Sequence, residues 1–179
     1  MGQRVRGEPM NIFYLSRDPV EAARAQCDRH VVKMILETAQ LLSTAHAELD
    51  GVSPAYKATH KNHPSAVWVR SSLDHYEWTV YHLEALGREY ERRYSKVHKT
   101  IREHFKALQR PPVALEGVRG YQDPPQCMPD EFKRSNAIHG YWTYYIIEKA
   151  KIVNKNEKPY TFNTIPEDVR YRYGIPRST

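Results

Sequence analysis

The stretch CDRHVVKMILETAQLLSTAH, residues 27–46, constrains most strongly what this chain can fold into. It contains no Pro or Gly and is rich in good helix formers, so it predicts a helix. At about 100° per residue, its apolar side chains spread over more of the circumference than the stripe of a surface helix does. The sequence therefore predicts a buried central helix, with Val32 and Leu36 among its apolar residues.

The remaining side of this helix carries a row of polar residues spaced three and four apart. A mostly buried helix places such a row in a cleft, because buried charges must be paired or solvated. The alternative is an ordinary ion pair between Lys33 and Glu37 on a solvated strip. The sequence leaves both interpretations open for the row, which consists of His30, Lys33, Glu37, Gln40 and Thr44.

Length and composition favour one soluble nucleic-acid-binding domain. The 179 residues are enough for a sizeable core, and the two cysteines form neither a disulfide framework nor a four-cysteine zinc site. No apolar run is long enough to span a membrane or resembles a signal peptide. We therefore expect a cytoplasmic protein, in the host cytoplasm if it is phage-encoded. The net charge of +6 and the 13 Tyr and 3 Trp favour nucleic acid as the partner.

The periodicity of the chain predicts an all-α fold, a compact single domain of four to five helices around the buried central helix, with irregular Pro-rich loops. We expect a disordered basic extension over residues 1–9, the helical domain over 10–155 and a basic, Tyr-rich segment over 156–179. Ser16 or Asp18 is expected to cap a first helix that has Pro19 in its first turn. Further helices are expected over 65–94, with a solvated charged end, over 96–109 and over 130–153, and a covering loop over 110–129.

The loop sequence THKNHP, residues 59–64, delivers two histidines and a lysine to the start of a helix. Backbone N–H groups at a helix start favour an anion, so this loop predicts a phosphate contact, to which Arg70 adds a further cation. A capped surface loop without a ligand is the alternative. The run YWTYY, residues 141–145, supplies Tyr144 and Tyr145 for base stacking, and Lys149 follows as a phosphate contact.

Three sets of residues compete for the chemistry. In the first, His30 and Glu37 lie two turns apart, about 10 Å along the helix axis, with room for general acid–base catalysis between them. In the second, His30, His46, His60 and His63 would bind a metal, but no carboxylate or cysteine pattern supports this, so we predict no metal. In the third, Cys27 is a nucleophile at the helix start, without an orienting group. We favour the first set.

The order of these motifs is similar to that of the phage pyrimidine-dimer DNA glycosylase/AP-lyase family, the small all-helical endonuclease-V-type repair enzymes. Asp28-Arg29-His30 stands in the place of the family's Asp-x-His, and Glu37, seven residues after the His, in the place of its catalytic Glu. The aromatic run at 141–145 with Lys149 resembles the family's C-terminal cluster. The resemblance spans residues 11–151 and implies a base-excision activity.

Two departures from the family pattern concern the mechanism. The family's nucleophile is the α-amino group of a small residue exposed by removal of the initiator Met, whereas here nine residues precede Met10 and Asn11 is large. Arginines that the family places near its Glu are replaced by residues such as Leu36 and Gln40. These differences leave the AP-lyase step open, while a glycosylase that activates water remains compatible with Glu37.

We therefore predict a monomeric DNA-binding base-excision enzyme, a DNA glycosylase acting on a damaged or modified base, that needs no cofactor. A non-enzymatic nucleic-acid-binding module and a small enzyme acting on a nucleotide or other phosphate compound are the alternatives. The catalytic pair is Glu37 and His30. The nucleic-acid contacts are Lys33, Gln40, His60, Lys61, His63, Arg70, Tyr144, Tyr145 and Lys149.

Overall fold

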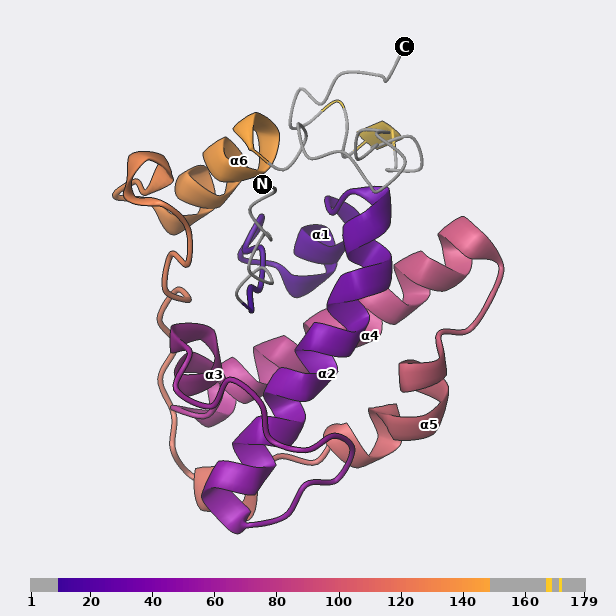
Figure 1. Cartoon of the computed structure of the whole chain (residues 1–179), viewed down its shortest axis with the longest axis vertical. Helices are drawn as coiled ribbons and strands as arrows, with labels where there is room; N and C mark the ends of the chain where they lie inside the picture. Colours follow the sequence, from indigo (N-terminus) through magenta and orange to yellow (C-terminus); the bar gives the residue numbers. More distant parts are fainter. Residues whose placement is uncertain (1–9, 149–166, 169–170, 172–179) are drawn as a thin grey trace, which may run out of the picture.

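The computed structural model describes residues 10–148, 167–168 and 171, and this part of the chain contains helices and no strands. The predicted all-α fold is therefore confirmed, and Figure 1 shows its arrangement. The predicted domain boundaries stay predictions, since residues 1–9 and most of 156–179 lie outside the described residues. The helices are α1 (Pro19–Arg24), α2 (Asp28–Asp50), α3 (Pro64–Val69), α4 (Leu73–Tyr94), α5 (Lys99–Leu108) and α6 (Ala137–Ile147), with 3-10 helices η1 (Val113–Leu115) and η2 (Asp130–Phe132).

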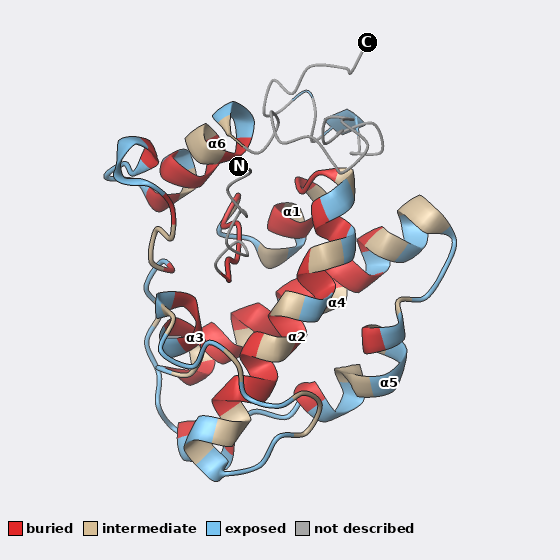
Figure 2. Cartoon of the chain, in the orientation of Figure 1, coloured by how far each residue is buried: buried red, intermediate tan, exposed pale blue. Residues whose placement is uncertain are grey.

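Helix α2 is the central element, as predicted. It packs against α3, α4 and α5, and most of its apolar side chains are fully buried. Val32 and Leu36, however, are 38% and 40% exposed, so the expectation that they are buried is wrong. The neighbouring elements cover most of the circumference of α2 and leave one strip open, and residues four apart share that strip. Figure 2 shows exposed and buried positions alternating along α2.

Two expected helices differ from the observed ones. The helix expected over 65–94 is divided into α3 and α4, because the Ser72 hydroxyl caps α4 by accepting a hydrogen bond from the backbone N–H of His75 at 3.1 Å. The helix expected over 130–153 is a 3-10 turn followed by α6, which Asn136 caps through the N–H of His139. The cap predicted at Asp18 is confirmed, since its carboxylate accepts from Val20 N–H at 2.8 Å.

The N-terminal segment over residues 10–17 has no regular structure but is largely buried, and it joins distant parts of the chain. The indole N–H groups of Trp142 and Trp78 donate to the carbonyls of Leu15 and Arg17, each at 2.8 Å. The Asn11 amide donates to the carbonyl of Cys127 at 2.9 Å. This segment thus fixes α6 and the covering loop in place beside the core.

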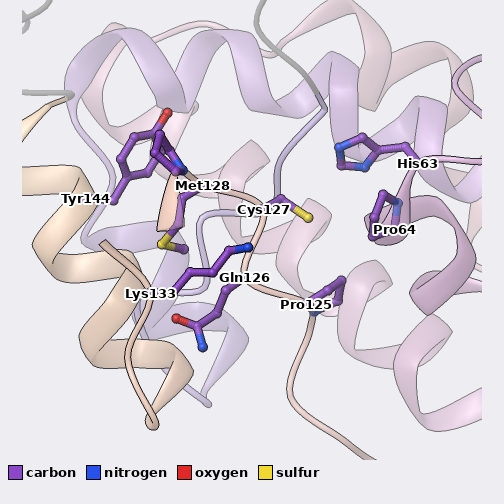
Figure 3. Close-up of a pocket in the computed structure, with 9 residues that line it drawn as sticks. His63, Pro64, Pro125, Gln126, Cys127, Met128, Lys133 and Tyr144 are labelled. Carbon is purple, nitrogen blue, oxygen red and sulfur yellow. The ribbon is translucent and has the colours of Figure 1, made fainter. Parts of the chain in front are cut away.

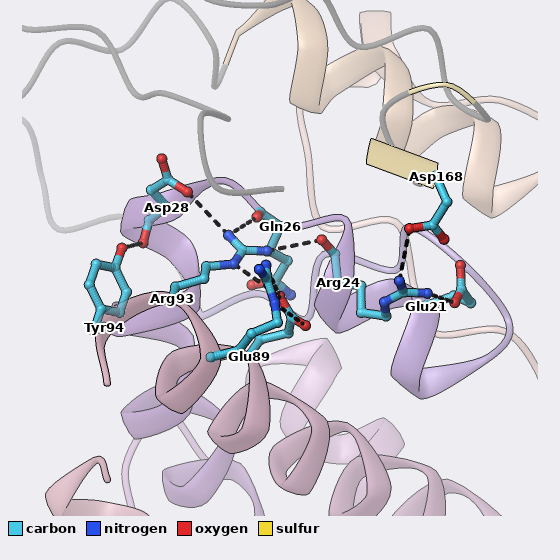
Figure 4. Close-up of polar contacts among 9 residues, drawn as sticks. Glu21, Arg24, Gln26, Asp28, Glu89, Arg93, Tyr94 and Asp168 are labelled. Atoms are coloured by element: carbon cyan, nitrogen blue, oxygen red, sulfur yellow. Dashed lines mark hydrogen bonds and ion pairs between the residues drawn. The ribbon is translucent and has the colours of Figure 1, made fainter. Parts of the chain in front are cut away.

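The charged C-terminal end of α4 is solvated only in part: Arg88, Glu91 and Arg92 are exposed as expected, whereas the side chain of Arg93 is fully buried. Its guanidinium donates to the carbonyls of Gln26 and Arg24 at 2.8 and 3.0 Å and to the Glu89 carboxylate at 3.0 Å. It also pairs with Asp28 at 3.3 Å, at the first residue of α2. Figure 4 shows how these bonds tie the end of α4 to the junction between α1 and α2.

Candidate active site

The polar row of α2 is buried at its ends and partly exposed in its middle. His30 and Thr44 are buried, whereas the side chains of Lys33 and Glu37 are 37% and 14% exposed. The Lys33 ammonium lies 3.2 Å from a Glu37 carboxylate oxygen, so the predicted i, i+4 ion pair forms. The structure thus gives α2 a carboxylate that is partly withdrawn from water but still reachable.

Contacts at both ends of the row show which way it faces. His30 stacks on the Phe13 ring at a centroid distance of 4.4 Å, and its Nδ1 lies 2.8 Å from the Tyr145 hydroxyl. The Thr44 hydroxyl accepts from the Thr59 N–H at 3.1 Å. Glu37 lies seven residues after His30 and seven before Thr44, so all three side chains share one face of α2. This face has the N-terminal segment and α6 at one end and the loop before α3 at the other.

A cavity of about 670 Å³ opens between these same elements. Figure 3 shows residues of the start of α3 on one side of it and Tyr144 of α6 with Lys133 on the other. Glu37 is not among its lining residues, although its helical face is bounded by the segments that form the cavity. The lining residues are His63, Pro64, Pro125, Gln126, Cys127, Met128, Pro129, Lys133 and Tyr144.

Hydrogen bonds hold the walls of this cavity in place. The Gln126 side chain both donates to the carbonyl and accepts from the N–H of Arg134, at 2.6 and 3.0 Å. The Cys127 thiol lies 3.4 Å from the hydroxyl of the buried Ser65. Lys133 pairs with Asp130 at 2.7 Å on the exposed rim. The cavity is therefore a fixed, largely apolar hollow with a cation at its edge.

The structure brings the predicted residues of the THKNHP loop together with Arg70. The Arg70 guanidinium donates to the carbonyl of Lys61 at 2.7 Å, which folds the end of α3 back onto the loop. The Lys61 ammonium is well exposed and lies 3.7 Å from Glu48. Helix α3 has only six residues, so the helix end on which the prediction relied is short.

His63 is held as a neutral ring in this loop. Its Nδ1 accepts a hydrogen bond from the Ser65 N–H at 3.2 Å, capping α3, so the ring proton resides on Nε2. Burial and the nearby charge of His60 lower the pKa of His63. A neutral His63 still offers its Nε2–H as a donor to a phosphate oxygen at the mouth of the cavity.

The two predicted stacking residues have different environments. Tyr144 is half-buried, lines the cavity and has its ring 5.3 Å from that of Phe132. Tyr145 is fully buried, and its hydroxyl accepts from the Cys27 N–H at 2.7 Å. Only Tyr144 therefore presents itself to a ligand in the cavity. Gln40 is half-buried on α2, and Lys149 lies outside the described residues.

The structure gives no support to the two alternatives that we did not favour, a histidine metal site and a nucleophilic Cys27. Among the described residues, no three His, Cys, Asp or Glu side chains are grouped as a metal site. The Nε2 of His46 is engaged with the Tyr76 hydroxyl and the Arg110 carbonyl, at 3.0 and 2.9 Å. Cys27 is buried, and burial raises the pKa of its thiol, which opposes a nucleophilic role.

No helix in the described ranges has the length and apolarity to cross a membrane.

Sequence reasoning missed the part of the cavity formed by residues 125–133. The covering loop has no hydrophobic period, so nothing in its sequence indicates which side chains face inward. Cys127, Met128 and Lys133 are brought to the site only by tertiary contacts, such as the bond between Asn11 and the Cys127 carbonyl.

Comparison with known proteins gives one match. Residues 10–103, just over half of the chain, match the family model described as pyrimidine dimer DNA glycosylase. This range begins at the buried Met10 and contains the whole polar row of α2, the THKNHP loop and Arg70. No curated protein and no solved structure gives a significant match.

Proposed function

The chain belongs to the pyrimidine dimer DNA glycosylase family, and on that premise we propose that Glu37 is the carboxylate at which the glycosidic bond of a damaged nucleotide is broken. Membership of the family implies a DNA glycosylase that acts in DNA repair on pyrimidine dimers. The observation that carries the assignment of the site is the position of Glu37. It is partly withdrawn from water, in the middle of the polar row and within the matched range.

The chemistry of base excision needs such a group. Cleavage of the bond between the sugar carbon and the base nitrogen leaves positive charge on the sugar. A positioned carboxylate stabilises that charge and can take a proton from an attacking water. The effect is larger where water is partly excluded, as around the Glu37 side chain. Lys33, 3.2 Å away, supplies a cation for the phosphate next to the damaged sugar.

His30 has a positioning role in this proposal. It is only 1% exposed and is held between the Phe13 ring and the Tyr145 hydroxyl, so a substrate does not reach it directly. These contacts lock the first turn of α2 against the N-terminal segment and α6. Because Glu37 lies two turns further on the same face, they set the direction in which its carboxylate points.

DNA binding uses the cations of the THKNHP loop, and the cavity receives the displaced nucleotide. The phosphate-binding surface consists of His60, Lys61, His63 and Arg70, of which His63 lines the cavity. Enzymes that act on a base in duplex DNA take a nucleotide out of the stack. A hollow of about 670 Å³ is in the size range of small-molecule pockets, and Tyr144 offers a ring for stacking. One copy of the chain supplies all of these groups, so we propose a monomer.

The direct test is incubation of the full chain with a duplex that carries one pyrimidine dimer and with the same duplex undamaged. We expect alkali-labile abasic sites to form at the dimer and none in the undamaged duplex. Trapping with borohydride shows whether an imine forms, which separates a lyase from a glycosylase that uses water. A chain that binds the damaged duplex but leaves every glycosidic bond intact contradicts the proposal.

A further inference from the structure

The exposed strip of α2, formed by Val32 and Leu36, has no role in the function described so far. The two side chains are 38% and 40% exposed and one turn apart, on a helix whose other large apolar residues are buried or, for Leu49, half-buried. Apolar surface left in water is unfavourable, and burying it against a ligand is favourable by roughly 25 cal/mol per Å². The strip is therefore a ready surface for a partner.

Its surroundings indicate which partner. Arg29 is exposed one turn before Val32, the partly exposed Lys33 follows Val32, and Glu37 follows Leu36 directly. The strip is thus an apolar surface that adjoins two cations and the proposed catalytic carboxylate. An apolar surface with cations along one edge matches the edge of a duplex, where the phosphates lie beside the stacked bases.

We propose that Val32 and Leu36 form an apolar wedge that packs against the bases at the damaged step and fills the space left when a nucleotide leaves the stack. This inference rests on the proposed function, which requires such a displaced nucleotide. Proteins that kink DNA insert apolar side chains of this kind between base steps. The wedge stabilises the opened duplex, whereas Arg29 and Lys33 bind its phosphates.

A second copy of the chain fits the strip less well than DNA does. A stable interface between proteins buries roughly 800 Å² on each partner, far more than two partly exposed aliphatic side chains provide. The adjoining cations of Arg29 and Lys33 would also face their own copies across a two-fold axis. DNA satisfies both the apolar strip and its charged neighbours.

The experiment compares the double variant Val32→Ala/Leu36→Ala with wild type and with the control Val20→Ala. Val20 is 47% exposed on α1, so its replacement removes exposed apolar carbons from another surface, although fewer than the double variant does. Ala favours the helix, so melting temperatures should not fall. Affinity is measured for a dimer-containing duplex and an undamaged one, and 2-aminopurine beside the lesion reports unstacking.

In the double variant, we expect the ratio of affinities for the damaged and the undamaged duplex to fall about tenfold, because this preference depends on the buried wedge. Much of the 2-aminopurine signal should be lost for the same reason. Its affinity for undamaged DNA should change less than twofold, since phosphate contacts provide that binding. Val20→Ala should behave as wild type.

An unchanged preference and an unchanged 2-aminopurine signal in the double variant, with an active wild type, would overturn the wedge alone. An equal loss of affinity for both duplexes would overturn it too, as would a concentration-dependent dimer that the double variant abolishes. A wild type without any action on the dimer would overturn the proposed function and the wedge together.

Discussion

The Arg93 network and the polar row around Glu37 both hold charged side chains against α2, but in opposite ways. Arg93 is fully buried, and its guanidinium bonds to two backbone carbonyls and two carboxylates (Figure 4). Glu37 keeps part of its surface in water, on a face bounded by the elements that form the cavity of Figure 3.

This difference separates structural from functional charge in the molecule. A buried cation is tolerated where several acceptors replace its lost hydration, and such a group fixes the arrangement of the chain. A partly exposed carboxylate can still exchange water for a substrate. We therefore expect substitutions in the Arg93 network to reduce stability, and substitutions around Glu37 to reduce activity.

The largest expected effect is the loss of stability in Arg93→Met. Removing the guanidinium leaves the carbonyls of Gln26 and Arg24 without this donor and leaves the buried Glu89 with Arg92 as its remaining arginine partner. Breaking a buried ion pair typically costs about 3–5 kcal/mol. Urea denaturation measures this change. The control is Arg88→Met, which removes an exposed pair with Glu84 and should change stability by less than about 1 kcal/mol. Equal effects of the two variants would contradict the distinction between the regions.

Glu37→Gln should reduce activity and leave stability nearly unchanged, the opposite of Arg93→Met. The side chain keeps its shape and helix propensity but loses the charge and the basic oxygen, so the rate of base release should fall about a hundredfold or more. DNA affinity and the denaturation midpoint should stay near those of wild type. Glu84→Gln, which changes the exposed i, i+4 pair with Arg88, serves as the control. Full activity with normal stability would remove Glu37 from the mechanism, and unfolding would give it a structural role.

The histidines of the two regions should respond differently to pH. His82 is fully buried between the Pro19 carbonyl and the Gln26 amide, and this burial lowers its pKa to about 4. The unfolded chain then binds more protons than the folded one below an ordinary His pKa of about 6.5, so stability falls as the pH falls. Between pH 7 and pH 5.5, His82 should lower the free energy of unfolding by about 1 kcal/mol.

Urea midpoints at the two pH values test this expectation in wild type and in His82→Phe. The variant should lose this part of the pH dependence, whereas His63→Gln, at the mouth of the cavity, should lose less of it. A wild-type stability that is independent of pH in this window would contradict the buried neutral state of His82.

The smallest effect is expected from substitutions in the phosphate-binding surface, which should change the salt dependence of DNA affinity. Lys61→Ala should flatten the slope of log affinity against log salt by about one unit, because one phosphate contact is lost. Arg88→Ala, which removes an exposed cation near α1, should leave the slope unchanged. Arg70→Ala should also flatten the slope, with a loss of loop structure because Arg70 donates to the Lys61 carbonyl. An affinity insensitive to salt would argue against DNA as the ligand.

Much of the site was predictable, because it lies on one strongly periodic helix and one loop that precedes a helix. The spacing of His30 and Glu37 placed both on one face of α2, and the loop delivered His60, Lys61 and His63 beside each other. The sequence did not indicate which of the predicted site residues are buried and which can reach a ligand. His30 and Tyr145 are ordinary polar residues in the sequence, and their burial depends on contacts more than 100 residues apart.

The sequence by itself determined the all-α fold, the central helix and its polar row, because helical periodicity and capping act between residues a few positions apart. The tertiary structure alone decided that Val32 and Leu36 are exposed, that Arg93 is buried and that residues 125–133 form a cavity with α3 and α6. These outcomes depend on which elements cover each face, and that is set by packing between segments far apart in the chain.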